Sequence, residues 1–561
     1  MSSLAAAACG LLAAGAALGA AELAAALSKP QTGPLLAVGS AFIDLTPAWL
    51  KDFAIRTFGG NDKNVLLLVL VIVVAAFAAA IGLAARRHPR LAGGGLASLG
   101  LVAAVAALSR PGSAPLDVLP SLLAAAVGAS ALHLTRRAWL RAFGTHLDAE
   151  RPTLSGRPSP EGRPSAPREA AAYPATTQEV TGGAGAATAP AAADHGWVSG
   201  SAAIGPMTDR RALLRTAATV LGFAAVTGGL GRVVSAARDT AAAGVRLVLP
   251  RPADPAPPLP VGSDLRLPGL GSFTTANKDF YRVDTALVVP RVPHQDWVLR
   301  IHGLVDRPVE LTFDDILARP LVERDITMTC VSNEVGGPYA GHARWLGVDL
   351  ADLLRQAGVQ AGADQILSRS ADGWTCGTPV QAVLDGRDAL LAVGMNGEVL
   401  PPVHGFPARM IVPGLYGYVS ATKWVTEIKL TRFADERAYW TSRGWAEHAP
   451  VKTASRIELP KPFARLAAGP ATIAGTAWAQ HRGVAAVEVR VDGGPWWQAR
   501  LAPSPNPDTW RQWHLDWQAT PGDHRLEVRA TDAVGHTQPQ QRAAPFPDGA
   551  TGWHSVLVTV R

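Results

Sequence analysis

With 561 residues, the chain is too long for a single domain. Hydrophobic residues make up 48% and charged residues 17% of the chain, and the mean hydropathy is +0.13, which together indicate membrane-spanning segments in part of it. The formal charge of +7 is not accompanied by a lysine-rich tract or an aromatic stacking motif, so nucleic acid is not expected as a partner.

The first 144 residues are rich in alanine and leucine and predict a bundle of transmembrane helices anchored in the lipid bilayer. Their length and apolar character indicate four spans, at residues 4–27, 64–85, 91–108 and 116–134. The intervening residues 34–59 are interrupted by charged side chains and predict a surface or re-entrant segment outside the membrane, with a conventional span as the alternative.

Arginine clusters follow the second and fourth spans, at Arg86–Arg87 and Arg136–Arg137, and predict that these helix ends lie in the cytoplasm. Residues 145–209 are rich in Pro, Ala, Gly, Ser and Thr and predict a disordered cytoplasmic linker. A fifth span is expected at 210–235. Five spans with a cytoplasmic N-terminus put the remainder of the chain on the extracytoplasmic side of the cell membrane.

The fifth span begins with Arg210 and Arg211. Twin arginines before a moderately apolar helix resemble a Tat export signal, whereas a pair of stop-transfer arginines before an ordinary helix fits the same residues equally well. After a proline-rich spacer at 236–262, residues 263–445 predict a mixed α+β domain and residues 446–561 an all-β sandwich. Strands are expected at 298–305, 411–419 and 424–433, and helices at 313–318 and 350–358.

The three cysteines, Cys9, Cys330 and Cys376, are too few for a disulfide framework, and no CxxCH haem, CxxC or HExxH zinc motif occurs. Cys9 lies in an apolar helix. Cys330 follows a short predicted strand, 325–329, and precedes the loop-forming residues 332–338. A thiol at this position is presented to a loop, although a buried structural cysteine is the commoner use of the residue.

Four segments in order, FYRVD at 280–284, TCVSN at 329–333, ARWLGV at 343–348 and the long segment at 390–425, resemble the catalytic domain of the sulfite oxidase family. The resemblance implies a molybdenum ion bound by a molybdopterin and by one protein cysteine, here Cys330. It implies that Arg282 is also catalytic. The cofactor-binding residues that it implies are Asn277, Tyr281, Arg282, Asp284, Cys330, His404, Arg409, Ser420, Thr422 and Lys423.

Residues 446–561 resemble the immunoglobulin-like dimerisation domain of the same family through the closing GWHSVLVTV segment, which suggests a homodimer. The chain departs from animal and plant sulfite oxidases at Val335 and Ser555, where those enzymes have arginines, and at 372–377, where they carry a tyrosine segment. The loss of two charge-assisted hydrogen bonds, roughly 1.5–3 kcal/mol each, predicts an intact metal centre with an altered sulfite pocket.

The activity implied by the resemblance is oxygen-atom transfer with a small oxyanion or S-oxide substrate. A reductase acting on methionine sulfoxide, another S-oxide or an N-oxide uses the same geometry. A non-catalytic adhesion or sensor protein built on the β-sandwich is a different class of alternative. Because the chain has no haem or flavin motif, electrons are expected to pass to or from an external partner, a quinone or a cytochrome. Glu22 and His133 are candidate quinone contacts in the spans, with interfacial residues as the simpler interpretation.

Overall fold

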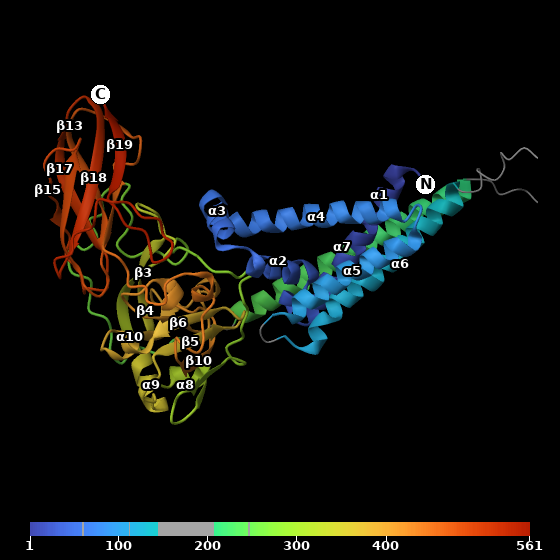
Figure 1. Ribbon diagram of the computed structural model, residues 1–561, viewed down its shortest axis with the longest axis horizontal. Helices are drawn as coiled ribbons and strands as arrows, with labels where there is room; N and C mark the ends of the chain where they lie inside the picture. The colour runs from blue at the N-terminus through green and yellow to red at the C-terminus, as the bar shows by residue number, and fades with distance from the viewer. Residues whose placement is uncertain (59–60, 111–112, 144–206, 245–246) are drawn as a thin grey trace, which may run out of the picture.

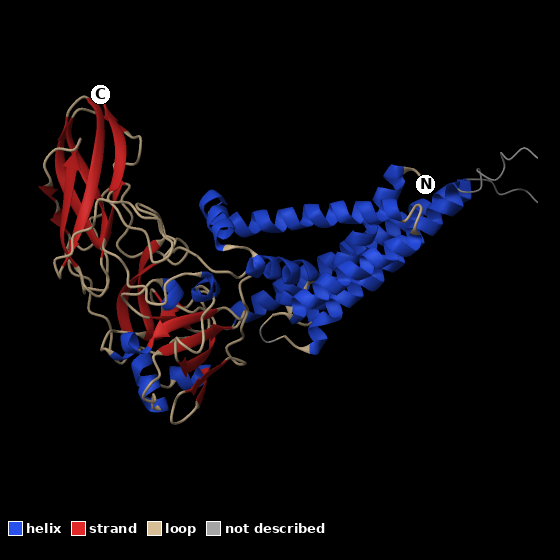
Figure 2. Ribbon diagram, in the orientation of Figure 1, coloured by secondary structure: helices blue, strands red, loops and turns tan. Residues whose placement is uncertain are grey.

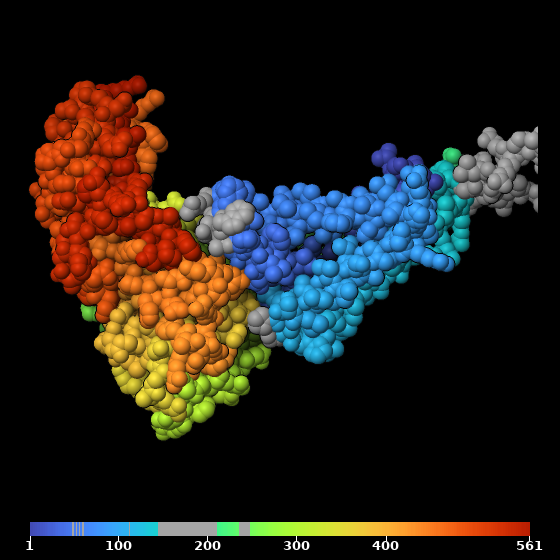
Figure 3. All heavy atoms as spheres, viewed as in Figure 1, coloured from blue at the N-terminus to red at the C-terminus, as the bar shows by residue number. Residues whose placement is uncertain are grey.

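A computed structural model describes residues 1–58, 61–110, 113–143, 207–244 and 247–561. The N-terminal helices form a long arm that meets a mixed α/β region at one end, and the β-rich C-terminal region lies above the mixed region in this view (Figures 1 and 2). In the space-filling view the N-terminal helices lie directly against the mixed region (Figure 3). The predicted linker lies outside the described residues, apart from its last three residues.

Five helices in the described part of the chain are long and apolar enough to cross a membrane. Two shorter helices, α2 and α3, replace the predicted surface segment at 34–59, and neither reaches the ~20 residues that a span requires. The seven helices are α1 (Ser3–Leu27), α2 (Pro34–Leu45), α3 (Ala48–Phe58), α4 (Asp62–Ala84), α5 (Pro89–Leu108), α6 (Leu119–Phe143) and α7 (Met207–Gly244).

Two of these helices end later than predicted, α6 at Phe143 instead of 134 and α7 at Gly244 instead of 235. Arginine and alanine favour helix whether or not lipid surrounds them, so the end of an apolar run does not mark the end of a helix. One short 3-10 turn, Pro30–Thr32, follows α1, and another, Pro115–Val118, precedes α6. Lys29 and Asp117 join these two turns by an ion pair of 3.0 Å.

Helices α4 and α6 end, and α1 begins, at the end of the arm that points away from the mixed region (Figure 1). The arginine clusters follow α4 or lie near the end of α6. Arg86 donates to the Ser3 hydroxyl at 2.6 Å, and Arg136 donates to the carbonyl of Ala85 at 3.0 Å. Arg210 lies over the ring of Phe143 at 5.4 Å. The starts of α1 and α7 therefore lie beside the ends of α4 and α6.

The mixed region contains two sheets. One has the strand order β2-β1-β10-β5-β6, and the other has the order β3-β4-β7-β8 with β9 paired to β7. Three short helices pack beside them. The bounds are β1 (Val298–Gly303), β2 (Val309–Thr312), α8 (Phe313–Leu317), β3 (Val322–Thr329), β4 (Ala340–Asp349), α9 (Leu350–Ala357), β5 (Gln365–Ser370), β6 (Thr375–Pro379), α10 (Val380–Leu384), β7 (Leu390–Met395), β8 (Glu398–Val399), β9 (Arg409–Ile411) and β10 (Val425–Thr431).

Local sequence explains α9 well. The Asp349 side chain caps the helix by accepting from the Asp352 N–H at 3.0 Å, and Gly358 ends it with a φ of 73°. Leu350, Leu353 and Leu354 face the core beneath the first sheet. By contrast, the expected strand at 411–419 is wrong beyond β9, because Pro413 and Gly414 (φ 82°) interrupt it and a 3-10 turn follows at Gly417–Val419.

The C-terminal region consists of two sheets with strand orders β11-β13-β17-β16 and β12-β19-β18-β14-β15. Residues from both sheets share one hydrophobic core, including Trp513 from the first and Val528 from the second. The bounds are β11 (Ala454–Leu459), β12 (Arg465–Leu466), β13 (Gly469–Trp478), β14 (Val484–Val491), β15 (Trp497–Gln498), β16 (Arg500–Leu501), β17 (Arg511–Ala519), β18 (Gly522–Asp532) and β19 (His554–Val560).

Helices α1 and α4 approach closely at two glycines. A Cβ added at Gly82 would lie 2.1 Å from the Ala6 carbonyl oxygen, and one added at Gly10 would lie 2.0 Å from that of Ala78.

We predict that Gly82→Ala destabilises the helical arm, whereas Gly94→Ala in α5, where nothing lies within 4 Å, is neutral or stabilising by roughly 0.5–1 kcal/mol. Thermal unfolding in detergent micelles measures both, and equal effects at the two positions would contradict this packing.

Candidate functional site

The Cys330 side chain lines a cavity of about 590 Å³ in the mixed region. Strand β3 ends at Thr329, and the next residue, Cys330, donates its N–H to the Tyr339 carbonyl at 2.9 Å. The Asn333 N–H then donates to the Cys330 carbonyl at 3.0 Å and closes a turn. This strand-to-loop junction matches the sequence prediction, and it directs the sulfur into the cavity.

Burial raises the pKa of the Cys330 thiol, while the backbone and side chain of Ser332 and the charge of Lys423 act in the opposite direction. All three cysteines of the chain are free and buried. Of these, Cys330 alone is among the residues that line the cavity. Cys376 lies on β6, where its sulfur is 3.7 Å from the Thr378 hydroxyl.

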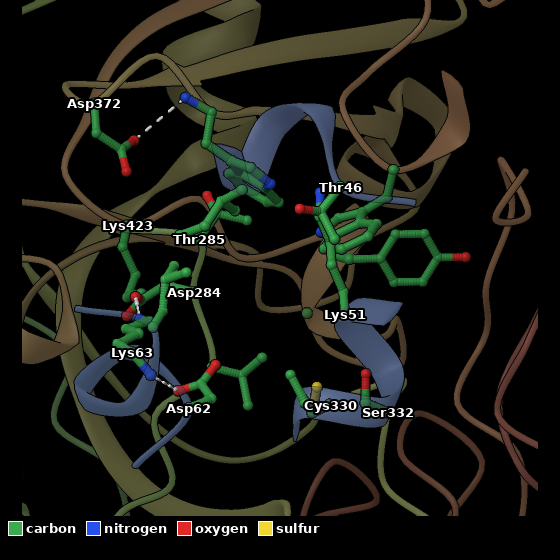
Figure 4. A pocket seen from close by; sticks show the side chains of 18 of the residues that line it. Thr46, Lys51, Asp62, Lys63, Asp284, Thr285, Cys330, Ser332, Asp372 and Lys423 are labelled. Atoms are coloured by element: carbon green, nitrogen blue, oxygen red, sulfur yellow. Dashed lines mark hydrogen bonds and ion pairs between the residues drawn. The ribbon is translucent and has the colours of Figure 1, made fainter. Parts of the chain in front are cut away.

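Both the mixed region and the N-terminal helices form the cavity wall. Figure 4 shows Lys51 and Thr46 on N-terminal segments that lie beside the pocket, with Cys330 and Ser332 near its base in this view. The residues of the mixed region on the wall include the aromatic side chains of Phe280, Tyr281, Trp374, Tyr418, Trp424, Trp440 and Trp445.

A buried carboxylate, Asp284, organises one side of the cavity (Figure 4). Its side chain is 7% exposed and pairs with Lys63 of α4, with Arg282 at 2.8 Å and with Lys423 at 2.5 Å. Burial by itself would raise the pKa of Asp284, but Lys423, Lys63 and Arg282 outweigh it and hold this pKa well below its ordinary value. Three cations around one carboxylate leave an excess of positive charge.

Arg409 and His404 lie on the wall of the same cavity. Arg409 is 5% exposed, donates to the His404 carbonyl at 3.1 Å and stacks on Trp345 at 5.2 Å. Its Nε is buried and has no hydrogen-bond partner among the described residues. Burial lowers the pKa of His404 to about 4, with Arg409, Lys423 and Arg282 acting in the same direction, so the imidazole is neutral at pH 7.

The other four predicted residues, Asn277, Arg282, Ser420 and Thr422, are not among the residues that line the cavity. The Asn277 carbonyl accepts from His404 Nε2 at 2.8 Å, and Arg282 pairs with Asp284. The Ser420 hydroxyl donates to the Tyr416 carbonyl at 3.0 Å, and the Thr422 hydroxyl pairs with Ser368 at 2.7 Å. Asn277 and Arg282 thus each contact a residue of the wall, whereas the hydrogen-bond partners of Ser420 and Thr422 are not on it. Tyr281, Asp284, Cys330, His404, Arg409 and Lys423 are brought together on it.

The positions that depart from animal and plant sulfite oxidases do not add a cation to this cavity. Val335 lines a separate, much smaller cavity of about 20 Å³. Beside it, Gly336 lies against His554, because a Cβ at Gly336 would be 2.2 Å from the imidazole. In the segment at 372–377, Asp372 and Trp374 reach the main cavity wall.

Sequence reasoning missed the contribution of the N-terminal helices. Lys63 pairs with a carboxylate 221 positions away, and Lys51 donates to the Tyr439 hydroxyl, 388 positions away, at 2.9 Å. The sequence does show charged residues, Lys51 and Lys63 among them, just before the apolar run of α4. These charges predicted only that the segment lies outside the membrane. Long-range pairing of this kind has no local sequence signature.

Comparison with known proteins identifies the class. Residues 286–440 match the oxidoreductase molybdopterin binding domain. The chain is 35% identical over 153 residues to the uncharacterized oxidoreductase YuiH of Bacillus subtilis (27% of this chain, 72% of YuiH), and 29% identical over 337 residues to the sulfite oxidase of Gallus gallus (50% of this chain, 72% of that protein). It is 27% identical over 317 residues to the NADH nitrate reductase of Solanum lycopersicum, covering 45% of this chain and 35% of that enzyme.

The chain therefore belongs to the family of molybdopterin-binding oxidoreductases that includes sulfite oxidase. The class of enzyme that this family defines is the molybdenum cofactor-dependent oxidoreductases.

The residues of the cavity fit this cofactor. A molybdopterin carries a phosphate and polar ring groups, and the wall offers Lys423, the unsatisfied Nε of Arg409 and the neutral imidazole of His404. The volume of about 590 Å³ lies in the range usual for cofactor sites. Within the described ranges no group of three or more His, Cys, Asp and Glu side chains could hold a metal ion, so a metal at Cys330 needs ligands from a cofactor.

We predict that Asp284→Asn lowers the free energy of unfolding by about 3–5 kcal/mol, because it leaves Lys63, Lys423 and the half-buried Arg282 without their carboxylate. Lys63→Met should cost less, since Arg282 and Lys423 still pair with Asp284. Chemical denaturation in detergent at pH 7 measures both. Asp352→Asn, which breaks the exposed pair with Arg355, serves as the control and should change stability by less than ~1 kcal/mol. An Asp284 effect no larger than this control would contradict the predicted role.

A second prediction concerns pH. The pKa of His404 lies below the ordinary value of 6.5, so the unfolded chain binds the proton more tightly and stability falls as the pH falls through 6.5. In cofactor-free protein, His404 should account for a loss of about 2 kcal/mol between pH 7 and pH 5, and His404→Gln should remove that part. Urea unfolding at both pH values checks this, with the exposed His448→Gln as control. A variant that retains the full loss would contradict it.

Proposed function

We propose that the chain is a membrane-anchored molybdenum enzyme that transfers an oxygen atom to or from a sulfur compound, with Cys330 as the protein ligand of the metal. This proposal depends mainly on one observation: the buried thiol of Cys330 lines the same cavity as Arg409 and Lys423. Thiolates are suitable ligands for a metal that is also held by cofactor sulfurs, and cations are suitable for the cofactor phosphate.

Each wall residue then has a role in binding or orientation. Lys423 and Arg409 would hold the anionic part of the cofactor, and the neutral His404, fixed by the Asn277 carbonyl, would contact its polar ring groups. Arg282 and Lys63 would act through Asp284 by holding this carboxylate ionised beside Lys423. The cofactor, when bound, supplies the two-electron chemistry of molybdenum. The Ser332 groups beside the sulfur would stabilise the thiolate.

A second candidate, reduction of an organic S-oxide, has support from the wall beside Cys330. The aromatic side chains of Trp374, Trp440 and Trp445 line the cavity, and Val335 and Ser555 stand where animal and plant sulfite oxidases use arginines to bind an oxyanion. An apolar aromatic wall favours an uncharged organic sulfur substrate over sulfite.

The membrane arrangement belongs to the same proposal. The clustering of Arg86, Arg136 and Arg210 at the end of the bundle away from the catalytic region favours a cytoplasmic location for that end. The catalytic and C-terminal regions would then be extracytoplasmic. The two-sheet core at the C-terminus supports an immunoglobulin-like domain, and the family resemblance supports its use in a homodimer.

We predict that Cys330→Ser retains the fold but loses turnover, because the phosphate-binding cations lie elsewhere on the wall. Metal and pterin analysis of the membrane-extracted protein tests the cofactor, and the steady-state rate tests the ligand. Cys376→Ser is the matched control, since it removes a buried thiol that is not on the cavity wall. A Cys330→Ser enzyme with wild-type activity, or wild-type protein purified without molybdenum after expression with the cofactor supplied, would overturn the proposal.

The direction of transfer is decided by two assays on the same preparation. Sulfite with ferricyanide as acceptor measures oxidation, and methionine sulfoxide with a reduced dye as donor measures reduction. A kcat/KM at least tenfold higher in the second assay would favour the reductase.

A further inference from the structure

The cavity at Cys330 has a second, apolar part that the cofactor chemistry does not explain. The cofactor-facing part is polar and contains Lys423, Arg409 and Asp284. The other part is walled by aromatic and aliphatic side chains of the N-terminal helices. These are Phe42 and Ile43 of α2, Leu50, Phe53 and Phe58 of α3, and Val65, Leu66, Val69, Leu70 and Val73 of α4. A charged, hydrogen-bonding pterin has no partners on such a wall.

Helix α4, which is long and apolar enough to cross a membrane, carries this apolar wall along its first three turns. From Asp62 to Val73 the helix advances about 16 Å at ~1.5 Å per residue, and the wall residues lie on one face at helical spacing. Beside this face, Leu68 and Ile72 are exposed by 60% and 58%. A lipid-soluble molecule in the bilayer would therefore have an apolar path along α4 toward Cys330.

The polar residues Lys51 and Thr46 lie on the wall beside the apolar side chains. Lys51 of α3 is 9% exposed and lies 5.3 Å from the Trp440 ring. Within the part of the chain that the structure describes, its ammonium group has one hydrogen-bond acceptor, the Tyr439 hydroxyl at 2.9 Å, which in turn donates to the Asp44 carboxylate at 3.0 Å. The ammonium group keeps hydrogens for a further acceptor, and Asp44 is exposed at the other end of this chain of hydrogen bonds.

We infer that the apolar part of the cavity binds the head group and first tail segment of a membrane quinone, with Lys51 donating to a quinone carbonyl oxygen. This inference rests on the proposed function. Trp440 and Trp445 offer flat surfaces to the ring, and α4 offers apolar surface to the tail. Because the chain has no haem or flavin motif, a carrier at this position would connect the catalytic region with the membrane pool.

The electrons and protons of substrate oxidation and quinone reduction balance. Oxidation of the substrate with an oxygen atom from water releases two electrons and two protons, and reduction of the quinone to the quinol takes up both. The path of Lys51, Tyr439 and Asp44 connects the ring to the surface for proton movement. Burial lowers the pKa of Lys51 to about 8, with Arg443 acting in the same direction, which eases proton exchange near neutral pH. In the reductase direction the same site takes quinol.

The test uses the full-length, cofactor-loaded protein in phosphatidylcholine nanodiscs and an azido derivative of decylubiquinone as the probe. After illumination, labelled peptides are mapped by mass spectrometry, with and without excess unlabelled decylubiquinone. We expect displaceable labelling within residues 42–73 or 440–445. Lys51→Met should weaken quinone affinity about tenfold or more, because it removes a hydrogen bond from a charged donor.

A matched pair of variants separates the cavity from the lipid-facing surface. Val69→Trp fills the apolar part and should reduce displaceable labelling at least tenfold, whereas Leu68→Trp, one residue away and off the wall, should leave it within twofold. Molybdenum content is measured for each variant, so that loss of the cofactor is recognised. Labelling that excess decylubiquinone does not displace, or an equal loss in Leu68→Trp and Val69→Trp, would overturn the quinone site.

Turnover distinguishes the two proposals. Activity with ferricyanide or a reduced dye, without saturable quinone binding, overturns the quinone site and leaves the proposed function standing. Saturable, Val69-dependent quinone binding in protein that turns over neither sulfur substrate supports the site and overturns the proposed function.

Discussion

The ionic cluster around Asp284 connects the two halves of the molecule. Its carboxylate accepts Arg282 from its own loop, Lys423 from the loop before β10 and Lys63 from the start of α4. A carboxylate that is 7% exposed is stable in ionised form only when it is paired, and one of its three partners, Lys63, joins α4 to the catalytic region. The cavity that contains Cys330 is walled by both halves as a result.

The N-terminal helices contribute directly to the cavity. Side chains of three of them, α2, α3 and α4, lie on its wall. The cluster of Lys51, Tyr439, Asp44 and Arg443 adds a second polar contact between the halves, with Arg443 donating to the Asp44 carbonyl at 3.0 Å. Polar contacts flank an apolar space, which is the usual composition of a small-molecule site.

The wall of the cavity combines two kinds of side chain. The cations that suit an anionic cofactor are present, whereas neither Val335 nor Ser555 lines the cavity. Tryptophan side chains from three places, Trp374, Trp440 and Trp445, occupy the wall of the same cavity. The cations and the tryptophans therefore belong to one cavity wall.

The sequence by itself determined the features that depend on local pattern. Apolar runs identified the five long helices, the strand before Cys330 ended where the loop residues predicted, and Asp349 and Gly358 bounded α9. Its motifs also identified the family. The tertiary structure alone decided that Asn277, Arg282, Ser420 and Thr422 do not line the cavity and that Lys51 and Lys63 do. Side-chain direction depends on packing, and an ion pair between residues 221 positions apart forms only when the fold brings them together, so neither has a signature in the local sequence.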